Sequence, residues 1–388
     1  MTHQVITHQA MDDQNSADPT TKRDTSQNRV RAFDFARGLA VLFMIMIHVL
    51  NSYGTSEVHE SGIGIGLQAF IDWPSASVFV FVMGGLIVQA SKGSLSAGLK
   101  RALGLFLLGY LLNFMRSSLP MWLSIQMGLV TYEQLGKYTP TSEFFVGDIF
   151  QFAGFAYAFC ITIRHYLPDA RYWLAAAVLI MFGSPYLWDL SVDWGASNEF
   201  FKLLWGDTSQ GAVFPFFPWV TYCLAGMCFG QWLKRSQDHH GVFNKALLLA
   251  VVLMAIGAAI IWTNPEFHAP HHLRAGPGLL ITISGYVLLW MFICQQVVVR
   301  VPPGRFLDTF YFWGKNVTAF YIIHWLLIGW GHMLVGANRL DTTSTLLSMV
   351  GVLVVSHFIL KGWVAFSEAK NSKAKKAEVA SRSTQTPA

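Results

Sequence analysis

Ten apolar runs occupy most of this 388-residue chain. Each run approaches the roughly 20 residues that an α-helix needs to cross ~30 Å of hydrocarbon. Backbone groups inside lipid must be paired within the protein, so such runs predict helices rather than irregular chain. We therefore expect an all-α, polytopic integral membrane protein with about ten transmembrane helices, embedded in a lipid bilayer. The runs lie at about 33–52, 73–91, 99–116, 145–164, 172–190, 212–233, 245–263, 279–299, 313–335 and 344–365.

Charge supports this class and indicates an orientation. Only 13% of the residues are charged, against about a quarter in soluble domains. The net charge of +5 does not predict a nucleic-acid partner, because the basic residues lie in loops between apolar runs. Lys and Arg are concentrated in alternate loops, and such loops are usually cytoplasmic, so we expect both termini in the cytoplasm.

Polar segments flank the apolar region. Residues 1–30 and 368–388 are rich in Ser, Thr, Gln, Lys and Ala, and we expect disordered cytoplasmic tails there. Residues 1–28 contain no apolar core of the kind a secretory leader needs. The expected transmembrane domain is 31–367.

The first run carries ionisable residues, which are costly at bilayer depth. Asp34 and Arg37 lie near its start and His48 lies deeper. On a helix Arg37 and His48 share a face and lie roughly 16 Å apart. One interpretation is structural, with Asp34 pairing with Arg37 and His48 bonding a neighbouring helix. The other is a stripe that holds a long ligand.

The ninth run repeats this pattern. Asn316, near the cytoplasmic side, and His324, deeper in the membrane, are two helical turns apart and share a face. A single buried histidine is usually a satisfied core residue, but two similarly built stripes favour a functional role. This pairing of His48 with His324 is the strongest constellation in the residue pattern.

Other polar groups could complete a site at either membrane surface. Lys100 and Arg101 could join Arg37 in a basic rim for the phosphates of a nucleotide-bearing cofactor, or could simply anchor helices on the cytoplasmic side. On the outer side, Asp148 and Gln151 are three residues apart. Asp148 could orient an imidazole, bond an acceptor hydroxyl or remain in water.

Three further features bear on packing and metals. The two prolines of 214–219 predict an irregular segment and suggest a pocket wall, while Pro74 suggests a helix start. Gly84 and Gly85 are typical of close helix packing. The four cysteines and the histidines of 268–272 have no clear metal-ligand spacing, so no metal is expected.

Four blocks resemble a known family. Phe-Asp-Phe-Ala-Arg-Gly-Leu-Ala-Val-Leu-Phe-Met-Ile-Met-Ile-His at 33–48 is similar to the opening of transmembrane acyltransferases related to heparan-α-glucosaminide N-acetyltransferase. The blocks at 75–84, 214–219 and 314–324 resemble the same family. The first block also shares features with the acyltransferase-3 family, whose first helix ends a comparable Arg-Gly run in His.

The resemblance implies an activity and a location. It implies transfer of an acetyl group from cytoplasmic acetyl-CoA, as co-substrate, to a hydroxyl or amine of an extracytoplasmic glycan or small-molecule acceptor, in a bacterial inner membrane. In the heparan-type family the catalytic histidine lies 22 residues beyond the Arg of Arg-Gly, which is His59 here. The family's active-site Asn corresponds to His48, a departure that instead matches the acyltransferase-3 pattern. Which histidine is the base therefore stays open.

On this interpretation the candidate residues take three roles. The acid/base candidates are His59, His48 and His324; the cofactor-binding candidates are Asp34, Arg37, Lys100, Arg101 and Asn316; and the acceptor-side candidates are Asp148 and Gln151. A proton-coupled transporter of a polar solute is the main alternative, with the intramembrane histidines as proton relays. An inactive partner in a cell-envelope assembly and a homodimer are also left open.

Overall fold

The computed structural model describes residues 30–90, 93–188, 190, 197–205, 212–269 and 274–383. These described residues form helices joined by short turns, and their only β pairing is two isolated bridges. The predicted all-α class is confirmed. The α-helices are α1 (Arg31–Tyr53), α2 (Ser56–Glu60), α3 (Gly62–Leu67), α4 (Trp73–Gln89), α5 (Leu95–Asn113), α6 (Leu119–Gln126), α7 (Tyr132–Leu135), α8 (Pro140–Phe145), α9 (Ile149–Tyr166), α10 (Ala170–Gly183), α11 (Ser197–Trp205), α12 (Phe216–Arg235), α13 (His239–Thr263), α14 (Pro265–His268), α15 (Pro277–Arg300), α16 (Arg305–Lys315), α17 (Val317–Val335) and α18 (Thr342–Ser383).

The helices are those of an integral membrane protein. Every predicted run overlaps one or two of these helices within the described residues. Within the described residues, seven helical stretches are both long and apolar enough to cross a bilayer. The remaining three runs correspond to α9, α10 and α12, so the number ten stays a prediction. The seven stretches are Arg31–Tyr53, Gly62–Gln89, Leu95–Gln126, His239–Thr263, Pro277–Arg300, Val317–Val335 and Thr342–Ser372.

Two helical stretches are longer than the predicted apolar runs, because a π-helical turn joins each one to a neighbouring α-helix. Pro74 is the second residue of α4, as expected, but the π-helical turn Gln68–Asp72 joins α3 to α4, so the helical chain begins earlier, at Gly62. The turn Phe114–Ser118 joins α5 to α6. A π-helical turn inserts a residue into a continuing helix and is frequent at functional sites. Hydropathy alone does not reveal such turns.

The ninth run is shorter than predicted. The helix breaks at Asn316, so Trp313–Lys315 belong to the preceding helix α16. The break lets α16 cross α1 closely: a Cβ built on Gly314 would lie 2.0 Å from the carbonyl oxygen of Asp34. Only glycine can approach a neighbouring backbone this closely.

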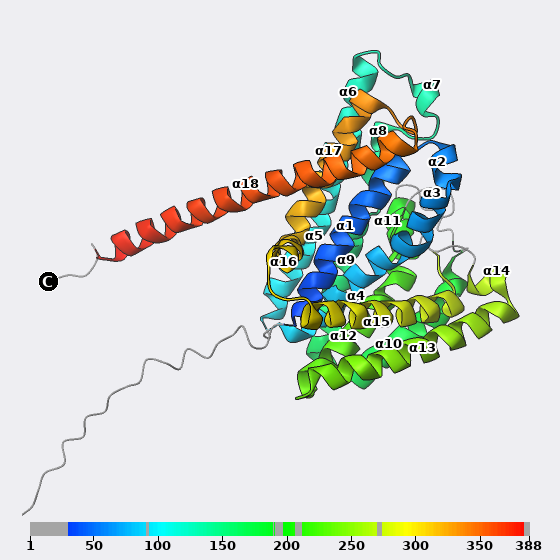
Figure 1. Cartoon of the computed structure of the whole chain (residues 1–388), viewed down its shortest axis with the longest axis vertical. Coiled ribbons are helices and arrows are strands. Elements are labelled where there is room, and N and C mark those ends of the chain that lie inside the picture. Colours follow the sequence, from blue (N-terminus) through cyan, green and yellow to red (C-terminus); the bar gives the residue numbers. More distant parts are fainter. Residues whose placement is uncertain are drawn as a thin grey trace, which may run out of the picture.

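Helix α1 runs through the middle of the molecule (Figure 1) and packs against α4, α15, α16, α17 and α18. Helix α18 leaves the body of the molecule (Figure 1) and stays helical to Ser383. Helix α18 thus includes residues 368–383, and the disordered tail expected at 368–388 stays a prediction. Of the amino-terminal tail expected at 1–30, residues 1–29 lie outside the described residues.

Helices α4 and α12 lie in close contact, as the glycines of α4 predicted. A Cβ on Gly84 would lie 1.9 Å from the carbonyl oxygen of Cys223, and one on Gly226 would lie 1.9 Å from that of Phe81. One turn further along both helices, Gly230 contacts Gly85 as Gly226 contacts Phe81, so the two helices run in the same direction. Their backbones touch, so no side chain larger than hydrogen fits at either glycine.

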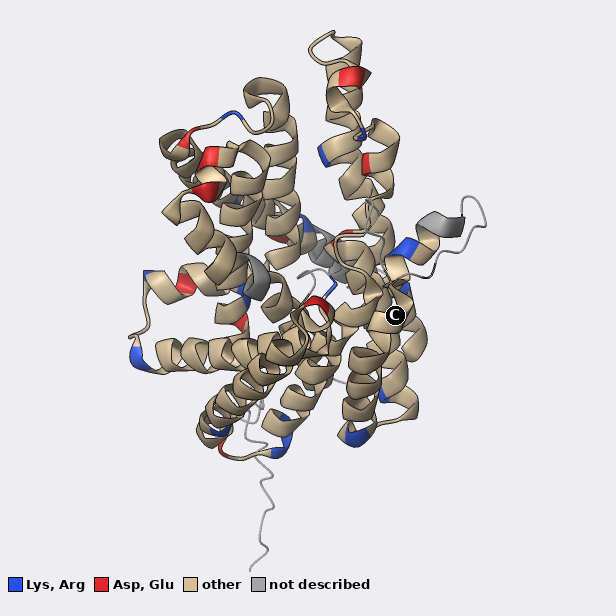
Figure 2. Ribbon diagram, turned by 90° about the vertical axis from the view of Figure 1, so that its right-hand side faces the viewer, with Lys and Arg blue, Asp and Glu red and all other residues tan. Residues whose placement is uncertain are grey.

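Several helix ends meet at one end of the molecule. Lys234 at the end of α12 donates to the carbonyl of Val88 in α4, at 3.1 Å. Arg164 at the end of α9 donates to the carbonyls of Ile87 and Ala90. Figure 2 shows that most charged residues lie at helix ends and connecting turns, as expected for helices with apolar middles.

Candidate active site

The two predicted histidine stripes meet. Nδ1 of His48 on α1 lies 2.9 Å from Nε2 of His324 on α17. The ring planes differ by only 8° and the centroids are 5.2 Å apart, which fits a hydrogen bond in the plane of both rings. Tyr53, one turn beyond His48, donates to the carbonyl of Ile328 at 2.7 Å and fixes the register of the two parallel helices.

A backbone carbonyl decides how this His48–His324 pair is protonated. Nδ1 of His324 lies 3.1 Å from the carbonyl oxygen of Phe320, which can only accept, so we assign a proton to that Nδ1. Nε2 of the neutral His324 then accepts from Nδ1–H of His48. The assignment leaves Nε2 of His48 as a lone pair, in the form that a general base needs.

Aromatic rings surround the pair. The ring of Trp325 lies 4.2 Å from that of His48, and the ring of Tyr321 lies 5.1 Å from that of His324. Tyr321 also meets Phe150 of α9, with centroids 5.0 Å apart. His324 is fully buried, whereas His48 is half-buried and so is the more accessible member.

An ion pair buried beside the histidines was not predicted. Nη2 of Arg116 lies 2.6 Å from Oδ2 of Asp148, and the Cζ of Arg116 lies 4.0 Å above the ring of Trp325. The hydroxyl of Tyr321 donates to the same Oδ2 at 3.3 Å. Arg116 lies in the π-helical turn Phe114–Ser118, at the end of the predicted run 99–116. The one feature of the sequence that could have predicted this ion pair is a single Arg at the end of an otherwise apolar stretch.

The acceptor-side candidates have separate roles in the structure. Asp148 is the N-cap of α9 and accepts from the N–H of Ile149 at 2.7 Å, in addition to its contacts with Arg116 and Tyr321. Gln151 completes the capping box by accepting from the N–H of Asp148, and it donates to the carbonyl of Val146. Gln151 therefore holds the start of α9, and Asp148 alone reaches the histidine cluster.

His59 does not join this cluster. It lies in α2, where the amide of Gln68 contacts its Nδ1 at 3.4 Å and its carbonyl at 3.2 Å. No hydrogen bond or ring contact within the described residues links His59 to His48 or His324.

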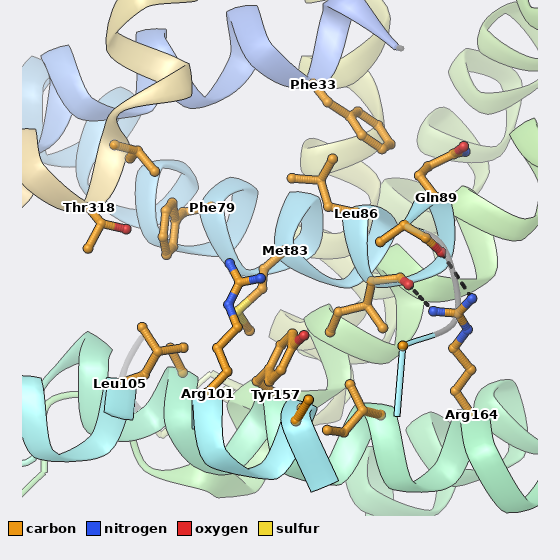
Figure 3. Close-up of a pocket in the computed structure, with 18 of the residues that line it drawn as sticks. Phe33, Phe79, Met83, Leu86, Gln89, Arg101, Leu105, Tyr157, Arg164 and Thr318 are labelled. Carbon is orange, nitrogen blue, oxygen red and sulfur yellow. Dashed lines mark hydrogen bonds between the residues drawn. The ribbon is translucent and has the colours of Figure 1, made fainter. Parts of the chain in front are cut away.

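A cleft of about 900 Å³ opens at the end of the molecule where the helix ends meet. Its lining includes Arg37, Arg101 and Arg164, and Figure 3 shows Arg101 and Arg164 pointing toward α4 from the opposite wall. Its deep end includes Phe150 and Val317. The cleft combines cationic groups at one end with an apolar interior.

The three arginines of the cleft have different partners. Nη2 of Arg37 pairs with Asp34 at 2.5 Å, and Arg164 donates to two backbone carbonyls at the end of α4. Arg101 lies 5.4 Å from the centroid of the Tyr157 ring. It is solvent-exposed and has no hydrogen bond or ion pair among the described residues, so its charge is the most accessible of the three.

Some predicted residues lie outside the cleft. Lys100 is exposed and does not line it, although the neighbouring Arg101 does. Asn316 lies at the break before α17 and donates to the carbonyl of Phe312 at 2.9 Å. The predicted irregular segment 214–219 is present, with non-helical angles at Phe217, but it does not line this cleft.

The cleft ends one aromatic layer from the histidine pair. Phe150 lines its deep end and packs on Tyr321, which in turn packs on His324. Among the described residues, no group of three or more His, Cys, Asp or Glu could hold a metal; His271 and His272 lie outside the described residues.

Residues 29–264 match the model of the heparan-alpha-glucosaminide N-acetyltransferase catalytic domain. This match covers more than half of the chain. The chain belongs to that family. The matched region contains His48, Arg116, Asp148 and most of the cleft, and it ends before α17, which supplies His324. No curated protein matches the chain. Family membership together with the apolar helices makes this protein a membrane acetyltransferase.

Proposed function

We propose that the protein transfers an acetyl group from acetyl-CoA, bound on the cytoplasmic side, to a hydroxyl or amine of an extracytoplasmic glycan or small molecule. The observation that carries this proposal is the cleft that begins among three arginines and ends one aromatic layer from the His48–His324 pair. A bacterial inner membrane and cytoplasmic termini fit the gathering of basic helix ends at the cleft mouth.

The cleft supports a nucleotide-bearing thioester. CoA carries several phosphate charges, and guanidinium groups suit phosphate oxygens. Arg101 is the best candidate for a phosphate contact, because Asp34 already neutralises Arg37 and two carbonyls already hold Arg164. Tyr157 beside it offers a ring face to the adenine. The apolar interior would take the pantetheine arm.

His48 is the proposed base. Its Nε2 would take the proton of the acceptor hydroxyl or amine as the acceptor attacks the thioester carbonyl carbon. The tetrahedral intermediate would then re-form C=O and expel the thiolate of CoA, which takes up the proton that His48 accepted. His324 would hold His48 in the required tautomer and support the imidazolium that forms, because its Nε2 accepts from His48 Nδ1.

Purified protein supplied with acetyl-CoA and glucosamine tests this function. We expect saturable thermal stabilisation by acetyl-CoA, release of CoA thiol and a product heavier by one acetyl group in mass spectrometry. The same protein without acetyl-CoA is the blank for thiol release. A transporter that uses the histidines as proton relays would show neither stabilisation by acetyl-CoA nor thiol release, and that result would reject the proposal.

A further inference from the structure

Arg116 has hydrogen-bond donors that no group in the described structure accepts. Its side chain is buried, with Nη2 on Asp148, while Nε and Nη1 have no partner. An unsatisfied buried donor costs on the order of 1–3 kcal/mol, and more when the group is charged. Buried polar groups are nearly always paired, so the exceptions in a structure call for an explanation such as a bound ligand.

The position of these donors indicates what they bind. Arg116 and His48 both lie against the ring of Trp325, with the guanidinium carbon 4.0 Å and the imidazole centroid 4.2 Å from it. The guanidinium carbon therefore lies no more than about 8 Å from the imidazole of the proposed base, and its free donors are sheltered from water. A fixed cation in such a low-dielectric site acts most strongly on charge that develops during a reaction.

We infer that Arg116 is a catalytic residue that holds the carbonyl oxygen of the transferred acetyl group. This inference rests on the proposed function. When the acceptor attacks the thioester carbon, the electron pair of the C=O bond moves to oxygen, and the free donors of Arg116 stabilise that oxyanion. The pair returns to re-form C=O as the C–S bond breaks and the thiolate leaves.

Asp148 and Tyr321 position this guanidinium. The carboxylate of Asp148 is held by the N–H of Ile149 and the hydroxyl of Tyr321, so it fixes one edge of Arg116 while the other donors stay free. The carbonyl of Arg116 also faces Gly329 on α17, where a Cβ would lie 1.8 Å from that oxygen. The backbone of the π-helical turn is therefore in direct contact with α17, the helix that carries His324.

The double variant Arg116→Met with Asp148→Asn separates catalysis from folding, because it removes the ion pair without leaving an unpaired buried charge. We expect it to fold and to keep the thermal stabilisation by acetyl-CoA, since neither residue lines the cleft. Its kcat should fall by ~10²–10³, the loss typical of an oxyanion donor. The loss should be equal for transfer to glucosamine and for slow hydrolysis of acetyl-CoA by water.

Arg116→Lys, which keeps the charge but presents a different donor geometry, is the second variant and should also lose kcat while remaining stable. A double variant with the kcat of the wild type would overturn the inference and make the ion pair structural. A higher KM for glucosamine with unchanged kcat and hydrolysis would also overturn it, by assigning Arg116 to acceptor binding. A wild-type protein that neither binds acetyl-CoA nor releases thiol would instead reject the proposed function itself.

Discussion

His48 and His324 lie within hydrogen-bond distance, 2.9 Å from Nδ1 to Nε2, although they are 276 residues apart in the chain. Because the carbonyl of Phe320 accepts the Nδ1 proton of His324, Nε2 of His324 accepts from His48 and leaves Nε2 of His48 free to act as a base. The family pattern pointed to His59 instead, and the two assignments differ in what they predict.

His48→Ala should lower kcat for acetyl transfer to glucosamine by roughly 10²–10⁴, the range for loss of a general base. His59→Ala is the matched control, because His59 lies outside the cluster, and we expect it to stay within a few-fold of wild type. Initial rates of CoA release measure both. Loss of activity in His59→Ala with full activity in His48→Ala would return the role of base to His59.

His324→Gln should retain more activity than His324→Leu. The amide oxygen of Gln can accept from Nδ1–H of His48, whereas Leu leaves that donor unpaired. One hydrogen bond contributes about 1 kcal/mol, so we expect about a fivefold difference in kcat. Equal rates in the two variants would contradict the assigned tautomer.

Arg101→Ala should weaken acetyl-CoA binding by about tenfold, near the lower limit for a charge-assisted hydrogen bond because the side chain is exposed. Lys100→Ala is the control, since Lys100 is equally basic but lies outside the cleft. Dissociation constants from calorimetry at low and high salt would show the effect diminishing as salt screens the charge. Similar losses in both variants would indicate a general charge effect and no specific phosphate contact.

Gly329→Ala should disturb the site from a distance. Its Cβ would lie 1.8 Å from the backbone oxygen of Arg116, so α17 or the π-helical turn must move. Overpacking of this kind costs about 1–3 kcal/mol, and we expect a lower Tm together with a lower kcat. Gly351→Ala on α18, where nothing lies within 4 Å, is the control and should not lower the Tm. A Gly329→Ala protein with unchanged Tm and rate would contradict the contact.

Glu143 makes stability depend on pH. Burial raises the pKa of its carboxyl above the ordinary value, mainly by desolvation and despite the nearby Arg116. The folded state therefore binds this proton more tightly than the unfolded state, and stability is lost as pH rises through the raised pKa. Glu143→Gln, which stays neutral, should raise the Tm at pH 7 and above, and the gain should disappear at acidic pH.

The control for Glu143 is Glu133→Gln, because Glu133 is exposed. Thermal unfolding of the detergent-purified proteins across pH would separate the two variants. A gain in Tm for Glu143→Gln that is the same at every pH would contradict a titration effect.

Predictions from the sequence succeeded where the pattern within a single helix is enough to decide the outcome. Apolar run length predicted the membrane helices, because every spanning segment must satisfy its own backbone. The spacing within each run placed His48 and His324 on stripes. The glycines of α4 predicted close packing, which Gly84 shows. Each of these follows from local geometry and from the solvent that a helix meets.

Arg116 shows where such reasoning stops. Its place in the sequence, at the end of an apolar run, is compatible with an outer loop. A π-helical turn continues the helix and directs the side chain inward to Asp148. Similarly, Lys100 and Arg101 are equivalent in composition, but the rotation of α5 against α9 places only Arg101 in the cleft.

Run length and hydropathy are enough to predict that this chain crosses a membrane on apolar helices, and residue spacing is enough to predict that two of them carry histidines within their apolar stretches. It could not determine which groups meet, because contacts between segments far apart in the chain depend on how the helices pack. Packing brought His48 to His324, placed His59 in α2 away from this pair, and buried Arg116 with Nε and Nη1 unpaired. Local periodicity sets the face of a helix on which a residue lies, whereas the contact between helices sets its partner.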